Sequence, residues 1–119
     1  MKYKNIKIKI NWIQFNSQIE ATVYNILIQN NIKILSREPI FILQNKFEYK
    51  NIKYREIKYK SDLLVEYNGE EIIIEIKWFE TPEWKIKKKL FIKKLKDEGS
   101  SYIFLVIKNL TQLKKYFNI

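Results

Sequence analysis

Two carboxylates and one lysine in this chain have a spacing that could hold a metal ion. Residues 59–78, YKSDLLVEYNGEEIIIEIKW, contain Asp62, Glu75 and Lys77 among Leu, Val and Ile side chains. Burial beside apolar neighbours raises the pKa of a carboxylate, and two adjacent carboxylates disfavour each other's charge. A divalent cation removes that conflict, and Mg²⁺ prefers carboxylate and carbonyl oxygens completed by water. These three residues are therefore the first candidates for a site.

A tight turn would bring the two carboxylates together. Asn68-Gly69 stands between two strand-like runs, which is a strong signal for a β-hairpin with a two-residue loop. That loop sets a register in which Asp62 lies opposite Glu75. Directly opposed residues share a face, with Cβ atoms about 4.5–5.5 Å apart.

The same register places Lys60 opposite Lys77, one step further along this face. An alternative is that Glu75 only pairs with Lys77 or Lys60, while Asp62 stays in water at a strand end. The other face of the hairpin is apolar and can pack on a helix; its residues are Leu63, Val65, Ile72, Ile74 and Ile76.

Composition limits the chemistry and suggests an anionic partner. The 119 residues include no Cys and no His, which excludes disulfides, thiolate zinc sites, Ser-His triads and an imidazole base. The chain has 23 Lys and Arg against 13 Asp and Glu, a net charge of +10. This excess favours binding to nucleic acid. Alternatively, part of the Lys and Ile excess reflects an AT-rich genome.

The element pattern predicts one α/β domain over residues 1–119, with a mixed sheet. Residues 1–14 are expected to be an N-terminal strand or arm, and 33–60 contain extended segments. A buried strand is expected over 101–108 and a short helix over 111–119. The order is α, three β, α, β, α. No membrane span or secretory signal is predicted, so we expect a cytoplasmic protein.

The first helix is predicted over about 17–30. In FNSQIE, Ser17 precedes Glu20 by three residues, which is the spacing of a capping box. That motif alone explains a glutamate at position 20.

The second helix is predicted over about 82–98, with Thr81 as its cap and Gly99 at its end. It is rich in lysine, which indicates either a solvated face or a path for a phosphate backbone. Aromatic and basic residues also interleave over 49–58 and either pack or extend that path. The helix lysines are Lys85, Lys87, Lys88, Lys89, Lys93, Lys94 and Lys96.

An Asp, a hairpin and then Glu-x-Lys resemble the core of the PD-(D/E)xK nuclease superfamily. Ser61 stands where the superfamily name has Pro. The chain is most similar to small phage-encoded proteins of unknown function in that superfamily, in which Gly is usual at Trp78 and Phe at Leu63. The matching segments are FNSQIE at 15–20, PIF at 39–41, YKSDL at 59–63, EIKW at 75–78 and IKKKLF at 86–91.

The resemblance implies a restriction-endonuclease-like αβββαβ core and a metal-dependent endodeoxyribonuclease. It implies that Glu20, Asp62 and Glu75, with the carbonyl of Ile76, hold Mg²⁺ or Mn²⁺. Lys77 would orient or deprotonate water, or stabilise the phosphate. The expected DNA contacts are Lys60, Trp78, Lys85, Lys87, Lys88 and Lys89.

By analogy with small nucleases of this superfamily, we expect a homodimer that cuts branched DNA in the manner of a Holliday-junction resolvase. We expect the chain to be phage-encoded and to act in the cytoplasm of a bacterial host. Two alternatives stay open. The chain could be the nuclease subunit of a transposition or restriction-type system that needs a partner. It could also be a catalytically idle nucleic-acid-binding module.

Overall fold

The structure is a computed structural model that describes residues 8–10, 13–15, 17–77 and 79–119. Its elements, in chain order, are β1 (Ile8–Ile10), β2 (Ile13–Phe15), α1 (Gln18–Gln29), β3 (Lys33–Arg37), β4 (Ile40–Gln44), β5 (Phe47–Tyr49), β6 (Ile52–Tyr54), β7 (Ile57–Lys60), β8 (Leu63–Tyr67), β9 (Glu70–Ile76), α2 (Pro82–Asp97), β10 (Ile103–Ile107) and α3 (Leu110–Phe117).

A four-stranded mixed sheet forms the centre, in the order β10-β9-β8-β3. β8 is antiparallel to β9 and to β3, whereas β10 is parallel to β9 because α2 makes the crossover between them. The fold is therefore a single mixed α/β domain, as predicted. Through this sheet the chain runs α1, β3, β8, β9, α2, β10, which is the expected αβββαβ order.

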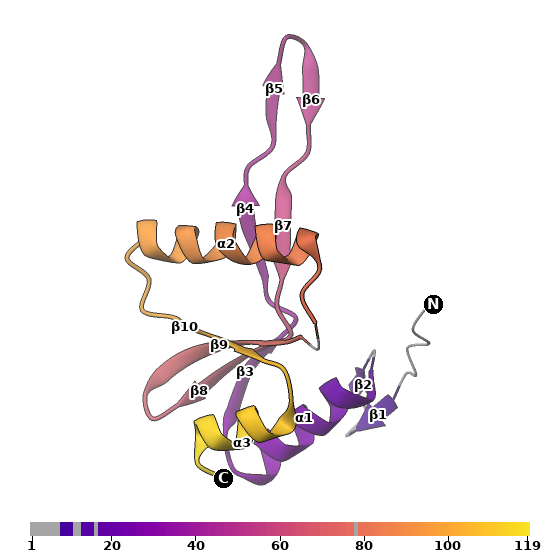
Figure 1. The fold of residues 1–119 in the computed structure, drawn as a ribbon, viewed down its shortest axis with the longest axis vertical. Helices are drawn as coiled ribbons and strands as arrows, with labels where there is room; N and C mark the ends of the chain where they lie inside the picture. The colour runs from indigo at the N-terminus through magenta and orange to yellow at the C-terminus, as the bar shows by residue number, and fades with distance from the viewer. Residues whose placement is uncertain (1–7, 11–12, 16, 78) are drawn as a thin grey trace.

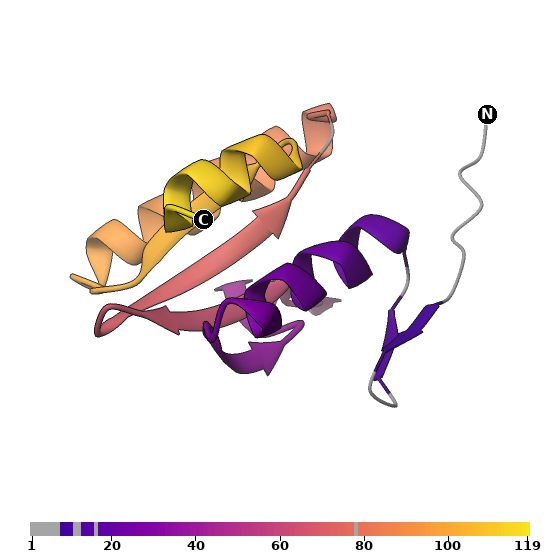
Figure 2. The ribbon, with the colours of Figure 1, turned by 90° about the horizontal axis from the view of Figure 1, so that it is seen from below.

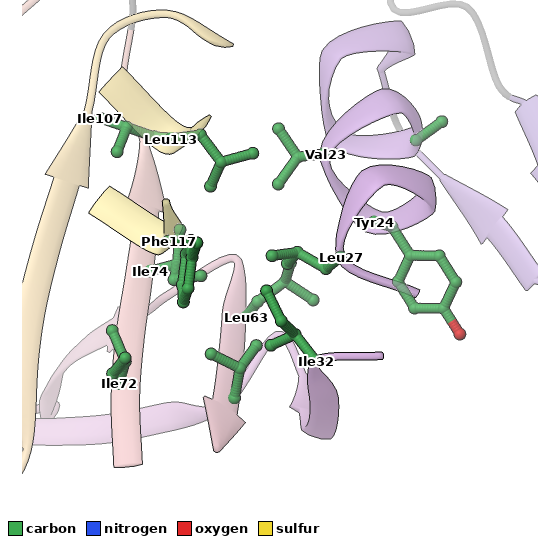
Figure 3. Close-up of a cluster of buried hydrophobic side chains, with 12 residues drawn as sticks. Val23, Tyr24, Leu27, Ile32, Leu63, Ile72, Ile74, Ile107, Leu113 and Phe117 are labelled. Carbon is green, nitrogen blue, oxygen red and sulfur yellow. The ribbon is translucent and has the colours of Figure 1, made fainter. Parts of the chain in front are cut away.

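The helices cover both faces of the sheet (Figure 1). α1 and α3 lie side by side on one face (Figure 2), where Val23 and Leu27 of α1 point towards Leu113 and Phe117 of α3 (Figure 3). The apolar face predicted for the hairpin packs here, with Leu63, Val65, Ile72 and Ile74 buried. α2 covers the other face through Trp84 and Phe91, which pack with Tyr59 and Ile73.

Between β3 and β8 the chain makes a long excursion that the sequence did not predict in this form. β4 pairs with β7, and β5 pairs with β6 beyond them, so residues 40–60 form a two-stranded projection that we call the β4–β7 arm. Figure 1 shows β4 and β7 beside α2, with β5 and β6 at the far end, away from the sheet. The arm carries the interleaved aromatic and basic residues.

The helix ends follow the predicted caps. The Ser17 hydroxyl accepts a hydrogen bond from the Glu20 N–H at 3.3 Å, and the Thr81 hydroxyl accepts one from the Trp84 N–H at 3.1 Å. Gly99 follows α2 with φ +60°, the left-handed conformation that favours glycine. In the described ranges, the helices are too short or too polar to cross a bilayer.

Candidate metal and nucleic-acid site

The β8–β9 hairpin has the predicted register and brings Asp62 next to Glu75. Leu63 lies opposite Ile74 in the last pair, so these two carboxylates lie immediately beyond it. The turn residues Asn68 and Gly69 have φ values of +52° and +77°. Positive φ at both positions is what a type I′ hairpin turn requires.

Ser61 fixes the bend that contains Asp62. It is 1% exposed, and its hydroxyl donates to the carbonyl of Ile74 at 3.1 Å. Its backbone N–H donates to the carbonyl of Pro39 at 3.0 Å. A proline lacks this N–H, so the departure from the superfamily pattern at this position has a structural counterpart.

The bend also shows that one sequence prediction was wrong. Lys60 ends β7 and lies opposite Ile40 of β4, not opposite Lys77. The bend at Ser61 and Asp62 separates β7 from β8, so the register of the hairpin cannot continue through it. The backbone N–H of Lys77 instead donates to the carbonyl of Ile107 in β10, at 2.8 Å.

Glu75 is a buried carboxylate, with 5% of its surface exposed. The Tyr59 hydroxyl donates a hydrogen bond to its Oε1, and the Lys77 Nζ lies 3.8 Å from its Oε2. Burial raises the pKa of Glu75, and these two partners oppose that rise. Burial, followed by the charge of Glu75, raises the pKa of Tyr59, so the phenol remains a donor at neutral pH.

Asp62 is held by the backbone and lies near two other carboxylates. Its Oδ2 accepts a hydrogen bond from the Ile76 N–H at 2.6 Å. Burial and then the charge of Glu75 raise the pKa of Asp62 to about 8, and the charge of Glu20 adds to the rise. Glu20, in the first turn of α1, therefore lies close enough to Asp62 for the two charges to interact.

The donor set has the chemistry that a hard divalent cation requires. Three carboxylates, Glu20, Asp62 and Glu75, interact electrostatically, and Lys77 is a cation that lowers the pKa of Glu75. A second positive charge would relieve the repulsion that raises the pKa of Asp62. No group of three or more Asp, Glu, His or Cys side chains in the described ranges is already arranged as a metal-binding cluster.

Lys77 is positioned by an aromatic ring as well as by Glu75. Its Nζ lies 4.8 Å from the centroid of the Trp84 ring, within the range of a cation–π interaction. Trp84 packs in turn against Tyr59, with ring centroids 5.6 Å apart. The indole Nε1 of Trp84 is buried and has no hydrogen-bond partner among the described residues.

A basic cleft of about 440 Å³ opens at this end of the sheet. Glu75 and Lys77 form part of its lining, between the base of the arm and the start of α2. Lys60 and Lys87, both predicted DNA contacts, line it as well. The complete lining is Ile40, Lys58, Tyr59, Lys60, Glu75, Lys77, Thr81, Glu83, Trp84 and Lys87.

The remaining predicted DNA contacts lie outside this lining. Lys88 is half-buried and pairs with Glu80 at 2.9 Å. Lys85 and Lys89 are exposed on α2. Trp78 lies outside the described residues.

Two residues of the site, Tyr59 and Trp84, received no role from the sequence. Tyr59 stands three residues before Asp62, in the segment YKSDL that carries the resemblance. Its position at the start of that motif was the usable signal in the sequence. Trp84 gave no such signal, since its contact with Lys77 depends on how α2 docks.

Comparison with known protein families gives a match over most of the chain. The family described as protein of unknown function (DUF1064) matches residues 1–112. Searches of the curated proteins and of the solved structures gave no significant match.

Proposed function

The chain belongs to the DUF1064 family, whose match covers residues 1–112, and we propose that it is a metal-dependent endodeoxyribonuclease. The observation that carries this proposal is the buried carboxylate of Glu75, which lies beside Lys77 in the lining of a basic cleft and next to the half-buried carboxylate of Asp62. Two adjacent carboxylates such as Asp62 and Glu75 are rarely found in apolar surroundings unless a cation compensates their charge.

Glu20, Asp62 and Glu75, with the carbonyl of Ile76, are the groups that would hold Mg²⁺ or Mn²⁺. When bound, such an ion lowers the pKa of water and neutralises charge on a phosphate, so hydrolysis needs no histidine. The protein supplies a fixed frame for it. The Ile76 N–H holds one oxygen of Asp62, and the Tyr59 hydroxyl holds one oxygen of Glu75.

Lys77 acts on the reacting groups. Its ammonium lies beside Glu75 and over the Trp84 ring, so it is aimed along the cleft wall and not extended into solvent. There it orients or deprotonates the attacking water, or stabilises negative charge that develops on the phosphate. The water oxygen bonds to phosphorus, the bond to the leaving oxygen breaks, and that oxygen takes a proton.

DNA is the substrate that fits the surface. Lys58, Lys60 and Lys87 line the cleft around the carboxylates, and phosphate groups satisfy such a lining. We propose branched DNA, as for a Holliday-junction resolvase, by analogy with the small nucleases that the chain resembles. Symmetric cutting of two strands would then require a homodimer.

Cleavage assays with matched variants test the proposal. Wild-type protein, Asp62→Asn and Lys77→Ala are incubated with branched, flapped and linear DNAs in Mn²⁺ or Mg²⁺. We expect wild-type protein to cut at least one branched DNA and both variants to lose cleavage by about 10³-fold or more. Lys77→Ala should still bind Mn²⁺, measured by calorimetry, whereas Asp62→Asn should not. Cleavage by Asp62→Asn at the wild-type rate would reject the site.

A second candidate function is a nucleic-acid-binding module without catalysis. It is favoured by the partners that Glu75 has within the chain, since Tyr59 and Lys77 contact its two carboxylate oxygens. DNA binding that persists in EDTA, with no cleavage of any DNA in the panel, would support this module. Cleavage that appears only after a partner protein is added would indicate a nuclease subunit.

A further inference from the structure

The tip of the β4–β7 arm carries its large apolar side chains on one face. Phe47 lies opposite Tyr54, and Tyr49 lies opposite Ile52. Residues two apart on a strand share a face, so all four side chains project from the same side of the ribbon. We call this set the tip platform. Its members are 49% (Phe47), 58% (Tyr49), 56% (Ile52) and 42% (Tyr54) exposed.

The tip platform has no packing role within the described chain. β5 and β6 pair only with each other, and the side chains of the platform belong to neither of the two cores. Phe47 and Tyr54 stack on one another with centroids 4.9 Å apart and an interplanar angle of 13°. An isolated two-stranded hairpin is only marginally stable in water. The exposed aromatic side chains of the tip platform are therefore available to contact a partner.

The charge of the arm indicates the chemistry of that partner. Residues 40–60 contain six Lys and Arg and two Glu, a net charge of +4. Lys50 sits in the turn with its Nζ 5.4 Å from the Tyr49 ring centroid. A groove of about 390 Å³ at the tip is lined by Lys46, Phe47, Glu48, Lys53 and Tyr54. A second copy carries a net charge of +10 and would repel this surface, whereas a polyanion complements it.

The arm is continuous with the candidate active site. Lys58 and Lys60 belong to β7 at the base of the arm, and both line the cleft that contains Glu75 and Lys77. From this base the arm extends outward through β7 and β6 to the tip platform (Figure 1). Exposed rings among lysines are the composition of surfaces on which unpaired bases stack.

We propose that the β4–β7 arm is a recognition element that stacks unpaired bases on its tip platform while the cleft holds the adjacent phosphates. The proposal deepens the proposed function and rests on it, because it names the DNA that the nuclease would select: DNA with single-stranded bases close to the cut. Fully paired duplex keeps its base faces stacked, so it offers the tip platform only phosphates and base edges.

Binding assays separate this role from cleavage. Affinities of the full chain are measured in EDTA by fluorescence anisotropy, with a flapped DNA and a fully paired duplex of the same length. We expect Tyr49→Leu, which keeps an apolar side chain but removes the ring, to weaken binding to the flapped DNA about tenfold. Tyr49→Phe should retain wild-type affinity. Tyr116→Leu replaces an exposed tyrosine of α3, outside the arm, and should change neither affinity.

The outcomes distinguish the possible partners. Equal affinity of Tyr49→Leu and wild-type protein for the flapped DNA would overturn the proposal. So would an equal loss on both DNAs, or a shift in oligomeric state by sedimentation with DNA affinity unchanged, since the latter assigns the tip platform to a second copy. If wild-type protein binds the flap through Tyr49 but cuts nothing in Mn²⁺, only the nuclease proposal fails. If it cuts but Tyr49→Leu keeps the wild-type preference, only the role of the arm fails.

Discussion

The β8–β9 hairpin and the tip of the β4–β7 arm are built on the same local plan but have opposite surroundings. Both are antiparallel strand pairs that turn through two residues of positive φ, Asn68-Gly69 in one and Lys50-Asn51 in the other. In β8–β9 the apolar residues are buried between helices, whereas those of the arm tip are exposed. Local hairpin chemistry therefore does not determine burial; the helices that dock on each ribbon do. The buried hairpin holds the carboxylates of Asp62 and Glu75 in place, whereas the exposed hairpin can contact a binding partner.

The comparison predicts its largest difference in the free energy of unfolding. Ile74→Ala removes a side chain that is 0% exposed in the central sheet, and we expect it to cost about 2–5 kcal/mol. Ile52→Ala makes the same change in the arm, where the side chain is 56% exposed, and should stay within about 0.5 kcal/mol of wild type. Urea unfolding followed by circular dichroism measures both. Similar losses in the two variants would mean that the tip is packed in solution.

The buried carboxylates should make the stability of the metal-free protein depend on pH. The folded-state pKa of Asp62, about 8, lies above the unfolded value of about 3.9, so the folded state binds more protons between these values. Stability is then greatest at or below about pH 4 as far as this group is concerned, and falls as pH rises towards 8. Asp62→Asn keeps an acceptor for the Ile76 N–H but cannot ionise. In EDTA at pH 9 it should be more stable than wild type, because an ionised Asp62 beside Glu75 destabilises the folded state there.

The exposed arm supplies the control for this titration. Glu48→Gln makes the corresponding carboxylate-to-amide change on β5, outside the site. Adding Mn²⁺ should stabilise wild-type protein and Glu48→Gln but not Asp62→Asn, because a ligand that binds only the folded state raises its stability. Thermal melts across pH 5–9, with and without Mn²⁺, give all of these values. If the stability of Asp62→Asn depended on pH as that of wild-type protein does, the Asp62 carboxylate would not be the cause of the pH dependence.

One substitution made at the base and at the tip of the arm tests the hydrogen bond to Glu75. Tyr59→Phe removes the hydroxyl that donates to the Glu75 carboxylate while keeping the ring in the aromatic cluster around Phe91. Loss of such a supporting bond lowers the affinity of a ligating carboxylate for metal, here by about tenfold. Tyr54→Phe in the arm should leave Mn²⁺ affinity unchanged. Titration calorimetry measures the Mn²⁺ affinity. Equal affinities of wild-type protein and Tyr59→Phe would show that the Tyr59 hydroxyl does not support metal binding.

The sequence predicted the β8–β9 hairpin well because its signals are local. Asn68-Gly69 determines the turn, and the alternation of apolar residues determines which face is buried. The helix caps at Ser17 and Thr81 are equally local. These features sufficed to place Asp62 beside Glu75.

The arm and part of the site could not be predicted in the same way. Lys50 has φ +50° in the two-residue turn between β5 and β6, where lysine is an uncommon residue. Asn51 was therefore the one residue of this turn whose type indicates a hairpin. Lys60 was misplaced because the bend at Ser61 depends on hydrogen bonds to Pro39 and Ile74, both distant in sequence. The contact of Trp84 with Lys77 likewise arises from the docking of α2.

The smallest effects are expected at the two turns, where only backbone conformation changes. Gly69 has φ +77°, and a Cβ added there would meet nothing within 4 Å, so Gly69→Ala tests conformational strain without a steric clash. It should cost about 1 kcal/mol, because an L-residue is disfavoured in this region. At Lys50, the substitution Lys50→Gly relieves the same strain but makes the unfolded chain more flexible and removes the contact with Tyr49. The net change in the free energy of unfolding should be within about 0.5 kcal/mol.

Amide hydrogen exchange resolves these effects, because it reports the opening of each hairpin separately. Gly69→Ala should speed exchange across β8 and β9 together with the whole core, since that hairpin opens only when the sheet unfolds. Lys50→Gly should change exchange only in β5 and β6, which pair with nothing else in the described chain. If Lys50→Gly altered protection in β8 or β9 as well, the arm would be coupled to the core. The β8–β9 hairpin and the tip of the arm would then not be independent units with separate roles.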